Sequence, residues 1–241
     1  VFYGMVAGVS KNNLTIDLGT KTGVLDLSKT NWIRGKQFKV GDIIECGLIE
    51  DGEVPKLTLE QSPEIEGASV IINPKTGDVV AVQGGYSYQR NQFNRVTQAL
   101  RQPGSAFKPI VYLAAVDGFN YSASTIVHDS PRTFTVGDTV WTPGNFDETF
   151  MGNITLRVAL EKSRNLVSVD VVTRIGLTPV IKYASLLGIE APLGRNLSIS
   201  LGSSEVTVLE LTRAYGVFPA EGVLFPSNFI SKIIDRNGNV I

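Results

Sequence analysis

The chain is poor in the residues that most often carry metal, redox or base chemistry, with one cysteine, Cys46, and one histidine, His128. A single cysteine excludes an internal disulfide and a CxxC metal site. With one histidine, lysine is the better candidate base for a hydroxyl nucleophile. The sequence also lacks an excess of either charge, since 22 Lys and Arg face 23 Asp and Glu. No whole-chain field therefore favours nucleic acid, an anionic membrane or an acidic substrate.

Long hydrophobic runs are absent as well. The run Ile110–Val116 is far short of the roughly 20 residues that cross a bilayer. The first residues, VFYGMVAGVS, lack both an initiator methionine and the features of a signal peptide. We therefore expect the chain to be a piece of a longer protein. At 241 residues and 43% hydrophobic content, it is long enough to bury a core in one or two domains.

Residues 1–62 are predicted to form a small β-barrel domain. Five short runs rich in β-branched and aromatic residues are separated by turn residues, and these runs cover 1–9, 13–18, 23–27, 39–49 and 54–60. This spacing is typical of a closed or half-closed barrel of the OB type. Acidic and basic residues nearly balance in this segment, whereas binders of single-stranded nucleic acid need a positive groove. A structural or partner-contact role is the better hypothesis, and no nucleic-acid binding is expected.

Residues 63–241 are predicted to form a second domain that mixes strands and helices, so that the fold class is α+β. Residues 68–85 have the pattern of strand, turn and strand. From Gly104 onward most segments have helical periodicity and end near a glycine. The last stretch, FISKIIDRNGNVI, is predicted to return to a strand with an Asn-Gly turn.

The stretch QPGSAFKP places Ser105 three residues before Lys108. The plain interpretation is a helix capped by Ser105 with a solvated Lys108. Residues three apart on a helix share a face, however, so the Lys108 amine could also act as base for the Ser105 hydroxyl. Burial and nearby positive charge lower an amine pKa, and first-turn amides at Ser105 could face a developing oxyanion. The motif thus offers a nucleophile, a base and half of an oxyanion hole.

Two further tripeptides match motifs of serine enzymes that act on penicillins. Ser163-Arg164-Asn165 follows a helical run, where the plain interpretation is a polar helix terminus. Lys-Thr-Gly occurs at 21–23 and at 75–77, and both copies precede Ser105. We assign the first copy to the barrel and the second to a β-turn, in which glycine supplies the required backbone angles.

Together these residues resemble the transpeptidase part of bifunctional, class A penicillin-binding proteins of the 1A type. The likeness rests on FNRVTQALRQPGSAFKPIVYLAA, WTPGNFD, GNITLRVALEKSRN and SLGSSEVTVLELTRAYGVF. It implies a serine β-lactamase/transpeptidase-like α/β domain preceded by an OB-like insert. It covers nearly the whole sequence, and the block around Ser105 is much more specific than the bare Ser-x-x-Lys.

The resemblance also implies roles for individual residues. Ser105 would attack the D-Ala-D-Ala end of a peptidoglycan stem peptide, and Lys108 would take its proton. Ser163 would relay a proton between Lys108 and the amines, and Asn165 would bind the donor amide and steady Lys108. Trp141 and Asn145 are weaker candidates for lining the substrate cleft, and no metal or cofactor is expected. The whole protein would be anchored in the inner membrane facing the periplasm, carry a glycosyltransferase and react with β-lactam antibiotics, and its barrel would contact cell-wall synthesis proteins.

In the family a Lys-Thr-Gly strand follows the Ser-x-Asn motif, whereas this sequence stops before such a strand. We therefore expect a C-terminally truncated transpeptidase domain that is inert as an isolated polypeptide. Two other functions stay open at this point. A serine β-lactamase or penicillin sensor shares Ser-x-x-Lys but would release or signal the bound drug, and a non-catalytic fragment would act through the barrel alone.

Overall fold

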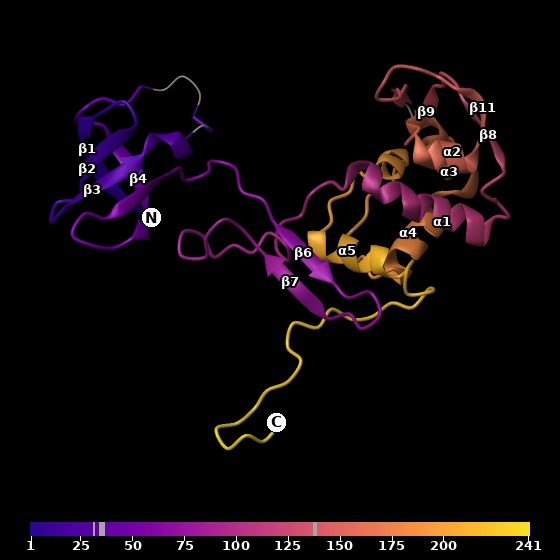
Figure 1. The fold of residues 1–241 in the computed structure, drawn as a ribbon. Coiled ribbons are helices and arrows are strands. Elements are labelled where there is room, and N and C mark those ends of the chain that lie inside the picture. The colour runs from indigo at the N-terminus through magenta and orange to yellow at the C-terminus, as the bar shows by residue number, and fades with distance from the viewer. Residues whose placement is uncertain (31, 34–36, 137–138) are drawn as a thin grey trace. The chain divides into compact units, whose positions relative to one another are not determined.

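The computed structural model describes residues 1–30, 32–33, 37–136 and 139–241. The chain divides into two compact units, Val1–Ile65 and Glu66–Ile241 (Figure 1). Within the described residues, no helix combines the length and the apolar character that crossing a membrane requires.

Unit 1 is a five-stranded closed barrel. Its strands are β1 Phe2–Val9, β2 Asn13–Asp17, β3 Thr22–Asp26, β4 Ile43–Glu50 and β5 Lys56–Glu60, and the short 3₁₀ turn Leu27–Lys29 follows β3. The strand order around the barrel is β1-β2-β3-β5-β4, with β3 and β5 parallel and the other pairs antiparallel. All five strands lie where the sequence predicts them. Side chains that alternate along each strand meet inside the barrel, and Cys46 is among the residues of this core.

Unit 2 is built mainly of helices. They are the 3₁₀ turn η2 Gly104–Phe107, α1 Lys108–Gly118, α2 Leu156–Glu161, α3 Asn165–Ile175, α4 Leu177–Leu186, the 3₁₀ turn η3 Leu197–Leu201 and α5 Val208–Gly216. Helix α1 contacts α2, α3 and α4, and its apolar side chains form the centre of the core of unit 2 together with those of α3. The helices predicted from periodicity are therefore confirmed.

A hairpin opens unit 2. Strand β6, Ser69–Ile72, pairs antiparallel with β7, Val79–Gln83, and α5 contacts β6 (Figure 1). The turn between the strands contains Lys75-Thr76-Gly77, where Gly77 has φ of +79° and its N–H donates to the carbonyl of Asn73 at 2.8 Å. This Lys-Thr-Gly is therefore a turn, as predicted, and the earlier copy lies at the start of β3 in the barrel.

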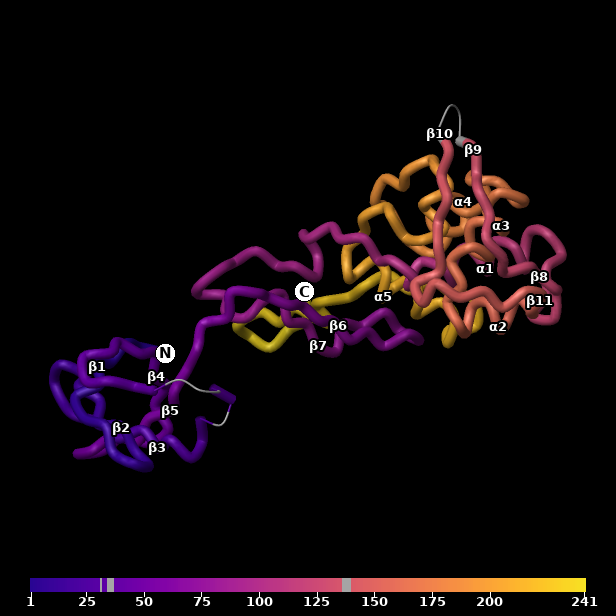
Figure 2. Tube along the Cα trace, turned by 90° about the horizontal axis from the view of Figure 1, so that it is seen from above, coloured from indigo at the N-terminus to yellow at the C-terminus, as the bar shows by residue number. Residues whose placement is uncertain are grey.

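In unit 2, the sequence pattern missed four short strands and wrongly predicted one at the C-terminal end. Four short strands occur where helices dominate the sequence pattern, and they pair as β8 Ile126–Asp129 with β11 Gly152–Thr155 and as β9 Phe134–Val136 with β10 Thr139–Trp141 (Figure 2). Runs of three or four residues are too short to show a period of two. Conversely, residues 229–241 form no strand, and an isolated bridge between Ile234 and Val240 closes their Asn-Gly turn.

Candidate active site

Ser105 lies in the 3₁₀ turn η2, exposed to solvent, immediately before α1. Pro103 occupies the N-cap position of this turn and no side chain caps it, so the prediction of Ser105 as a helix cap is wrong. The N–H of Lys108 donates to the carbonyl of Ser105. In a 3₁₀ turn residues three apart are eclipsed, and the turn therefore places Ser105 and Lys108 on one face.

Lys108 is the first residue of α1 and is buried, with 1% of its surface exposed. Pro109 disfavours helical angles at the residue before it, yet Lys108 has φ of −55° and ψ of −40°. Its Nζ donates to the carbonyl of Ser163 at 2.6 Å, contacts the hydroxyl of Ser163 at 3.0 Å and donates to Oδ1 of Asn165 at 2.7 Å. The alternative of a solvated Lys108 is wrong.

Burial changes the chemistry of the Lys108 amine. Loss of solvation, and then the positive charge of Arg164, lower the pKa of Lys108 from 10.5 to about 8. The three acceptors of Nζ carry no charge, so none of them restores the cationic form as a carboxylate would. Near neutral pH a useful fraction of the amine is therefore uncharged and able to accept a proton.

Ser163 connects α2 to α3 with an unusual backbone, since its φ is +54°. Left-handed angles cost free energy for any residue that carries a Cβ. Here both the carbonyl and the hydroxyl of Ser163 reach the same amine, that of Lys108. A strained conformation thus presents two oxygen atoms of one residue to the candidate base.

Asn165, the first residue of α3, divides its side-chain amide between two partners. Oδ1 accepts from Lys108, and Nδ2 donates to the carbonyl of Gly144 at 2.9 Å. These contacts link the start of α3 to α1 and to the loop that follows β10. Asn165 therefore lies in direct contact with the Lys108 amine.

The two weaker candidates occupy different places. Asn145 is buried, and its Oδ1 accepts from the N–H of Asn165 at 2.8 Å while its Nδ2 donates to Asp129 at 2.8 Å. Its side-chain amide thus binds the N-terminus of α3. Trp141 packs against Phe134, with ring centroids 6.1 Å apart, in a small cluster that also contains Leu166.

A cavity of about 400 Å³ collects most of these residues. Its lining comprises Ser105, Asn145, Phe146, Asp147, Lys162, Ser163, Arg164 and Asn165. The structure thus brings three of the four predicted catalytic residues to one cavity, and Lys108 contacts two of them from the buried side. Among the residues that the structure describes, the amine makes its hydrogen bonds with Ser163 and Asn165 and none with the Ser105 hydroxyl. Hydrogen bonds of this kind are often completed only when substrate is bound.

Arg164 is a residue of the site that sequence reasoning missed. Its guanidinium is buried, and it donates from Nε to Asp129 at 2.8 Å, from one terminal nitrogen to Asp147 at 2.9 Å and from the other to the carbonyl of Thr149. Asp129 ends β8 and is fully buried. The only signal in the sequence was the position of Arg164 between Ser163 and Asn165, because its carboxylate partners lie far away along the chain.

Backbone and side-chain contacts from other elements support the Ser105 turn. Gly202 caps η3 with φ of +69°, and its carbonyl accepts from the N–H of Gly104 at 3.2 Å. A Cβ on Gly202 would lie 2.1 Å from the carbonyl oxygen of Gly104, so only glycine fits there. The hydroxyl of Tyr215 in α5 donates to the carbonyl of Ala106 at 2.6 Å. Neither contact is visible in the local sequence pattern.

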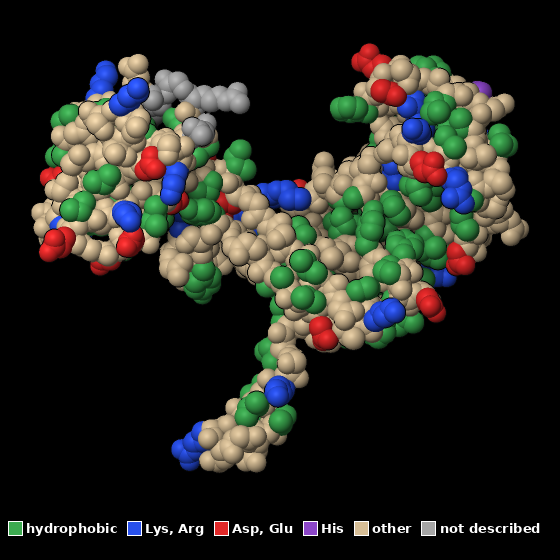
Figure 3. Space-filling model, in the orientation of Figure 1, with side chains coloured by type: hydrophobic (Ala, Val, Ile, Leu, Met, Phe, Trp, Pro, Cys, Tyr) green, Lys and Arg blue, Asp and Glu red, His purple; other side chains and the backbone are tan. Residues whose placement is uncertain are grey.

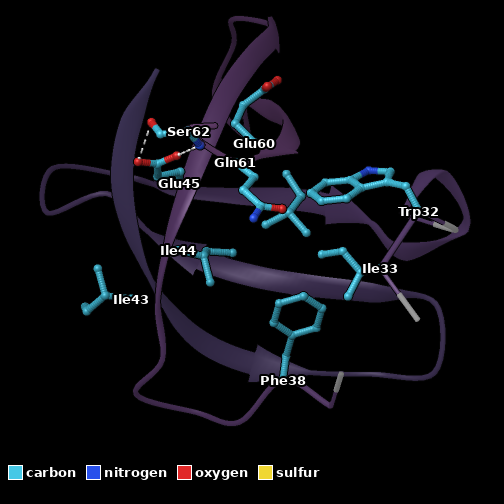
Figure 4. Close-up of a pocket in the computed structure, with 10 residues that line it drawn as sticks. Trp32, Ile33, Phe38, Ile43, Ile44, Glu45, Glu60, Gln61 and Ser62 are labelled. Carbon is cyan, nitrogen blue, oxygen red and sulfur yellow. Dashed lines mark hydrogen bonds between the residues drawn. The ribbon is translucent and has the colours of Figure 1, made fainter. Parts of the chain in front are cut away.

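Other cavities in the described residues lie away from this site. In unit 2, apolar side chains gather over α1 and α5 (Figure 3) and line a groove of about 670 Å³, with Tyr112, Leu113, Leu160 and Phe218 among them. In unit 1, a cavity of about 390 Å³ lies at one end of the barrel, with Trp32, Phe38, Glu45 and Gln61 among its lining residues (Figure 4). Within the described residues, no three His, Cys, Asp or Glu side chains form a group able to hold a metal ion.

The family model of the penicillin binding protein transpeptidase domain matches residues 67–240. The chain therefore belongs to the transpeptidase family of penicillin-binding proteins. It is 37% identical over 98% of its length to Penicillin-binding protein 1A of Rickettsia conorii, and the match covers 30% of that protein. The chain thus spans less than a third of the length of this curated relative.

Solved structures agree with this assignment. The crystal structure of Penicillin-Binding Protein 1A from Haemophilus influenzae matches with a TM-score of 0.85 at 30% identity, over 100% of this chain and 36% of that one. The PonA1 protein from Mycobacterium tuberculosis in complex with penicillin V matches with a TM-score of 0.64 at 26% identity, over 72% of this chain and 48% of that one.

Proposed function

We propose that the chain carries the acyl-transfer site of a peptidoglycan D,D-transpeptidase, with Ser105 as nucleophile and Lys108 as base. The observation that supports this proposal best is the buried Lys108 amine, held by Ser163 and Asn165 and placed three residues after an exposed serine. We also propose that the whole protein is longer than this chain, as its relatives are, and that it has a glycosyltransferase activity as well. It would be anchored in the inner membrane, with this domain in the periplasm.

The first half-reaction forms an acyl-enzyme. Uncharged Lys108 accepts the proton of Ser105, and the hydroxyl oxygen attacks the carbonyl carbon of the penultimate D-Ala of a stem peptide. The N–H of Ser105, at the start of a helical segment, faces the oxyanion that develops. The C–N bond to the terminal D-Ala breaks, and its amine leaves with a proton passed from Lys108 through the Ser163 hydroxyl.

The second half-reaction makes the cross-link. The amine of a second stem peptide attacks the ester carbonyl and gives up a proton through Ser163 to Lys108. The ester bond to Ser105 breaks, and Lys108 returns the proton to the serine oxygen. A penicillin follows the first half-reaction, but its ring opens without losing a leaving group, so the acyl-enzyme persists.

Labelling of the full-length protein by a labelled penicillin tests this proposal. Ser105→Ala should abolish covalent labelling, whereas Ser124→Ala, which alters an exposed serine of the same unit, should not. Labelling that survives Ser105→Ala would refute the nucleophile. An acyl-enzyme that hydrolyses within seconds instead of persisting for many minutes would favour a β-lactamase.

A second function is proposed for unit 1, as an OB-like barrel that docks a cell-wall synthesis protein. The closed order β1-β2-β3-β5-β4 and the cavity beside half-exposed Trp32 support it. In a binding assay between the full chain and a purified cell-wall synthesis protein, Trp32→Ser should weaken binding and Val54→Ser, at another exposed apolar residue of the barrel, should not. Equal binding by both variants would exclude this cavity.

A further inference from the structure

Arg164 occupies the middle of the motif that contacts Lys108, and its own side chain points away from the amine into an ion-pair network. The residue is 4% exposed. Its Nε binds Asp129 at 2.8 Å, and one terminal nitrogen binds both carboxylate oxygens of Asp147, at 3.1 and 2.9 Å. Its backbone N–H also donates to the carbonyl of Ala159 in α2 at 2.9 Å. The guanidinium therefore ties the junction between α2 and α3 to β8 and to the loop that follows Asn145.

The two carboxylates that balance Arg164 differ in environment. Asp129 is fully buried and also accepts from Asn145 at 2.8 Å and from the N–H of Met151 at 3.0 Å. The Asp147 side chain is 50% exposed and lines the Ser105 cavity. Hydrogen bonds from Thr149, and then the contact with Arg164, lower the pKa of Asp147 to about 2. Asp147 is therefore an anion near neutral pH, and its side chain is reached by solvent.

The charges near the Lys108 amine are few. Arg164 directly follows Ser163 in the chain, and its guanidinium pairs with Asp129 and Asp147. Lys162 lines the cavity. On the next turn of α1, burial raises the pKa of Tyr112 to about 12, so that its hydroxyl stays neutral. The net positive charge that Lys108 experiences from this side therefore depends on how completely the two carboxylates offset Arg164.

We propose that Arg164 and Asp147 are positioning residues for Lys108: the buried guanidinium holds Ser163 and Asn165 around the amine, and the exposed carboxylate sets how much uncompensated positive charge the amine experiences. This inference rests on the proposed function of Lys108 as base. It adds that Asp147 adjusts the positive charge that the Lys108 amine experiences. Because Asp147 lines the cavity, the adjustment takes place where substrate binds.

Removing the Asp147 charge leaves the positive charge of Arg164 less compensated, and this disfavours protonated Lys108. The lower limb of the acylation–pH profile, where the rate rises as Lys108 loses its proton, therefore moves to lower pH. Removing the Arg164 charge would move the limb upward. Arg164→Met would also leave Asp129 buried and unpaired, and loss of folding would obscure the result. Asp147→Asn is therefore the decisive variant, since asparagine can keep the contacts with Thr149.

The experiment measures the second-order rate of acylation of the full-length protein by a labelled penicillin between about pH 5 and 10, using a drug whose charge is constant over that range. The wild-type limb should lie near pH 8, where the pKa of Lys108 falls. In Asp147→Asn it should shift to lower pH by about half a unit, and the shift should shrink in high salt. Glu148→Gln makes the same charge change at the exposed neighbouring residue and should leave the limb in place.

Arg164→Lys separates position from charge. It keeps the positive charge but loses the planar fork that binds both carboxylates, so acylation should slow with the limb nearly unmoved. An unmoved or raised limb in Asp147→Asn, or an equal shift in Glu148→Gln, would overturn the proposal while leaving the nucleophile intact. Failure of the wild-type full-length protein to be labelled would instead count against the proposed function itself.

Discussion

The two units use the same residue type, lysine, in opposite ways. In the barrel, Lys56 is exposed and pairs with Glu50 at 2.7 Å, and the hydrogen bond and charge of Glu50 raise the pKa of Lys56. In unit 2, Lys108 is buried among uncharged oxygen atoms, and its pKa falls to about 8. Glu50 thus stabilises the charged form of Lys56, whereas burial makes Lys108 lose its proton more easily.

This difference shows that the partners of a lysine decide its chemistry more than its place in a motif. An exposed carboxylate neighbour stabilises the ammonium and leaves it well solvated, which contributes little to folding. Burial with neutral acceptors makes the ammonium costly and the free amine available. The comparison would fail if the two lysines responded alike to substitution.

The largest expected effect follows from removing the two amines. Lys108→Met should lower the rate of acylation by penicillin about 10²–10⁴-fold, as loss of a general base does, whereas Lys56→Met should leave the rate unchanged. Acylation of the wild type should rise with pH up to about 8, because Lys108 must be deprotonated. Single-turnover labelling of the full-length protein across pH measures both, and circular dichroism shows whether each variant is folded. Equal rates in the two variants would contradict the assignment of the base.

A smaller effect is expected on stability when a glycine of each unit is replaced by alanine. Gly202→Ala forces a Cβ against the backbone of Gly104 at a position with φ of +69°, and it should destabilise the protein by at least about 2 kcal/mol. In the barrel, a Cβ on Gly52 would meet no atom within 4 Å, and Gly52→Ala should change stability little. Denaturant unfolding of the two variants measures the difference. If Gly202→Ala lowers the free energy of unfolding only slightly, η3 moves away from the Ser105 turn easily.

The smallest effect concerns the backbone of Ser163. With φ of +54°, this position favours glycine over alanine, so Ser163→Gly should be more stable than Ser163→Ala by about 0.5–1 kcal/mol. Both variants lose the hydroxyl, and their acylation rates should fall together. At Ser124, which is outside the residues with positive φ, alanine should be at least as stable as glycine. Equal preferences at the two serines would remove the evidence for strain.

The sequence predicts local features of this fold well. The five barrel runs, the helices of unit 2 and the turn at Gly77 all have short-range signals in periodicity or turn chemistry, and the structure confirms them. The predictions that failed depend on tertiary contacts or on very short segments. Four strands of three or four residues were missed, and residues 229–241 have strand propensity without a partner along their length.

The features of the candidate site also divide into those that the sequence indicates and those that depend on long-range contacts. The spacing of Ser105 and Lys108 follows from helix geometry, and the family likeness adds Ser163 and Asn165. The burial of Lys108 and its contacts with residues more than fifty positions away cannot be derived from local pattern. The pairing of Arg164 with Asp129 is likewise long-range. Long-range packing therefore determines the environment of the amine.

The closure of the barrel limits how another protein can bind unit 1. Within the described residues every strand from β1 to β5 has a neighbour on both sides, the shortest contact being the two residue pairs of β3 with β5, so the barrel offers little free strand edge for an added strand. A protein that docks on unit 1 must recognise it through side chains and loops, and substitutions of single side chains are the appropriate way to locate that contact.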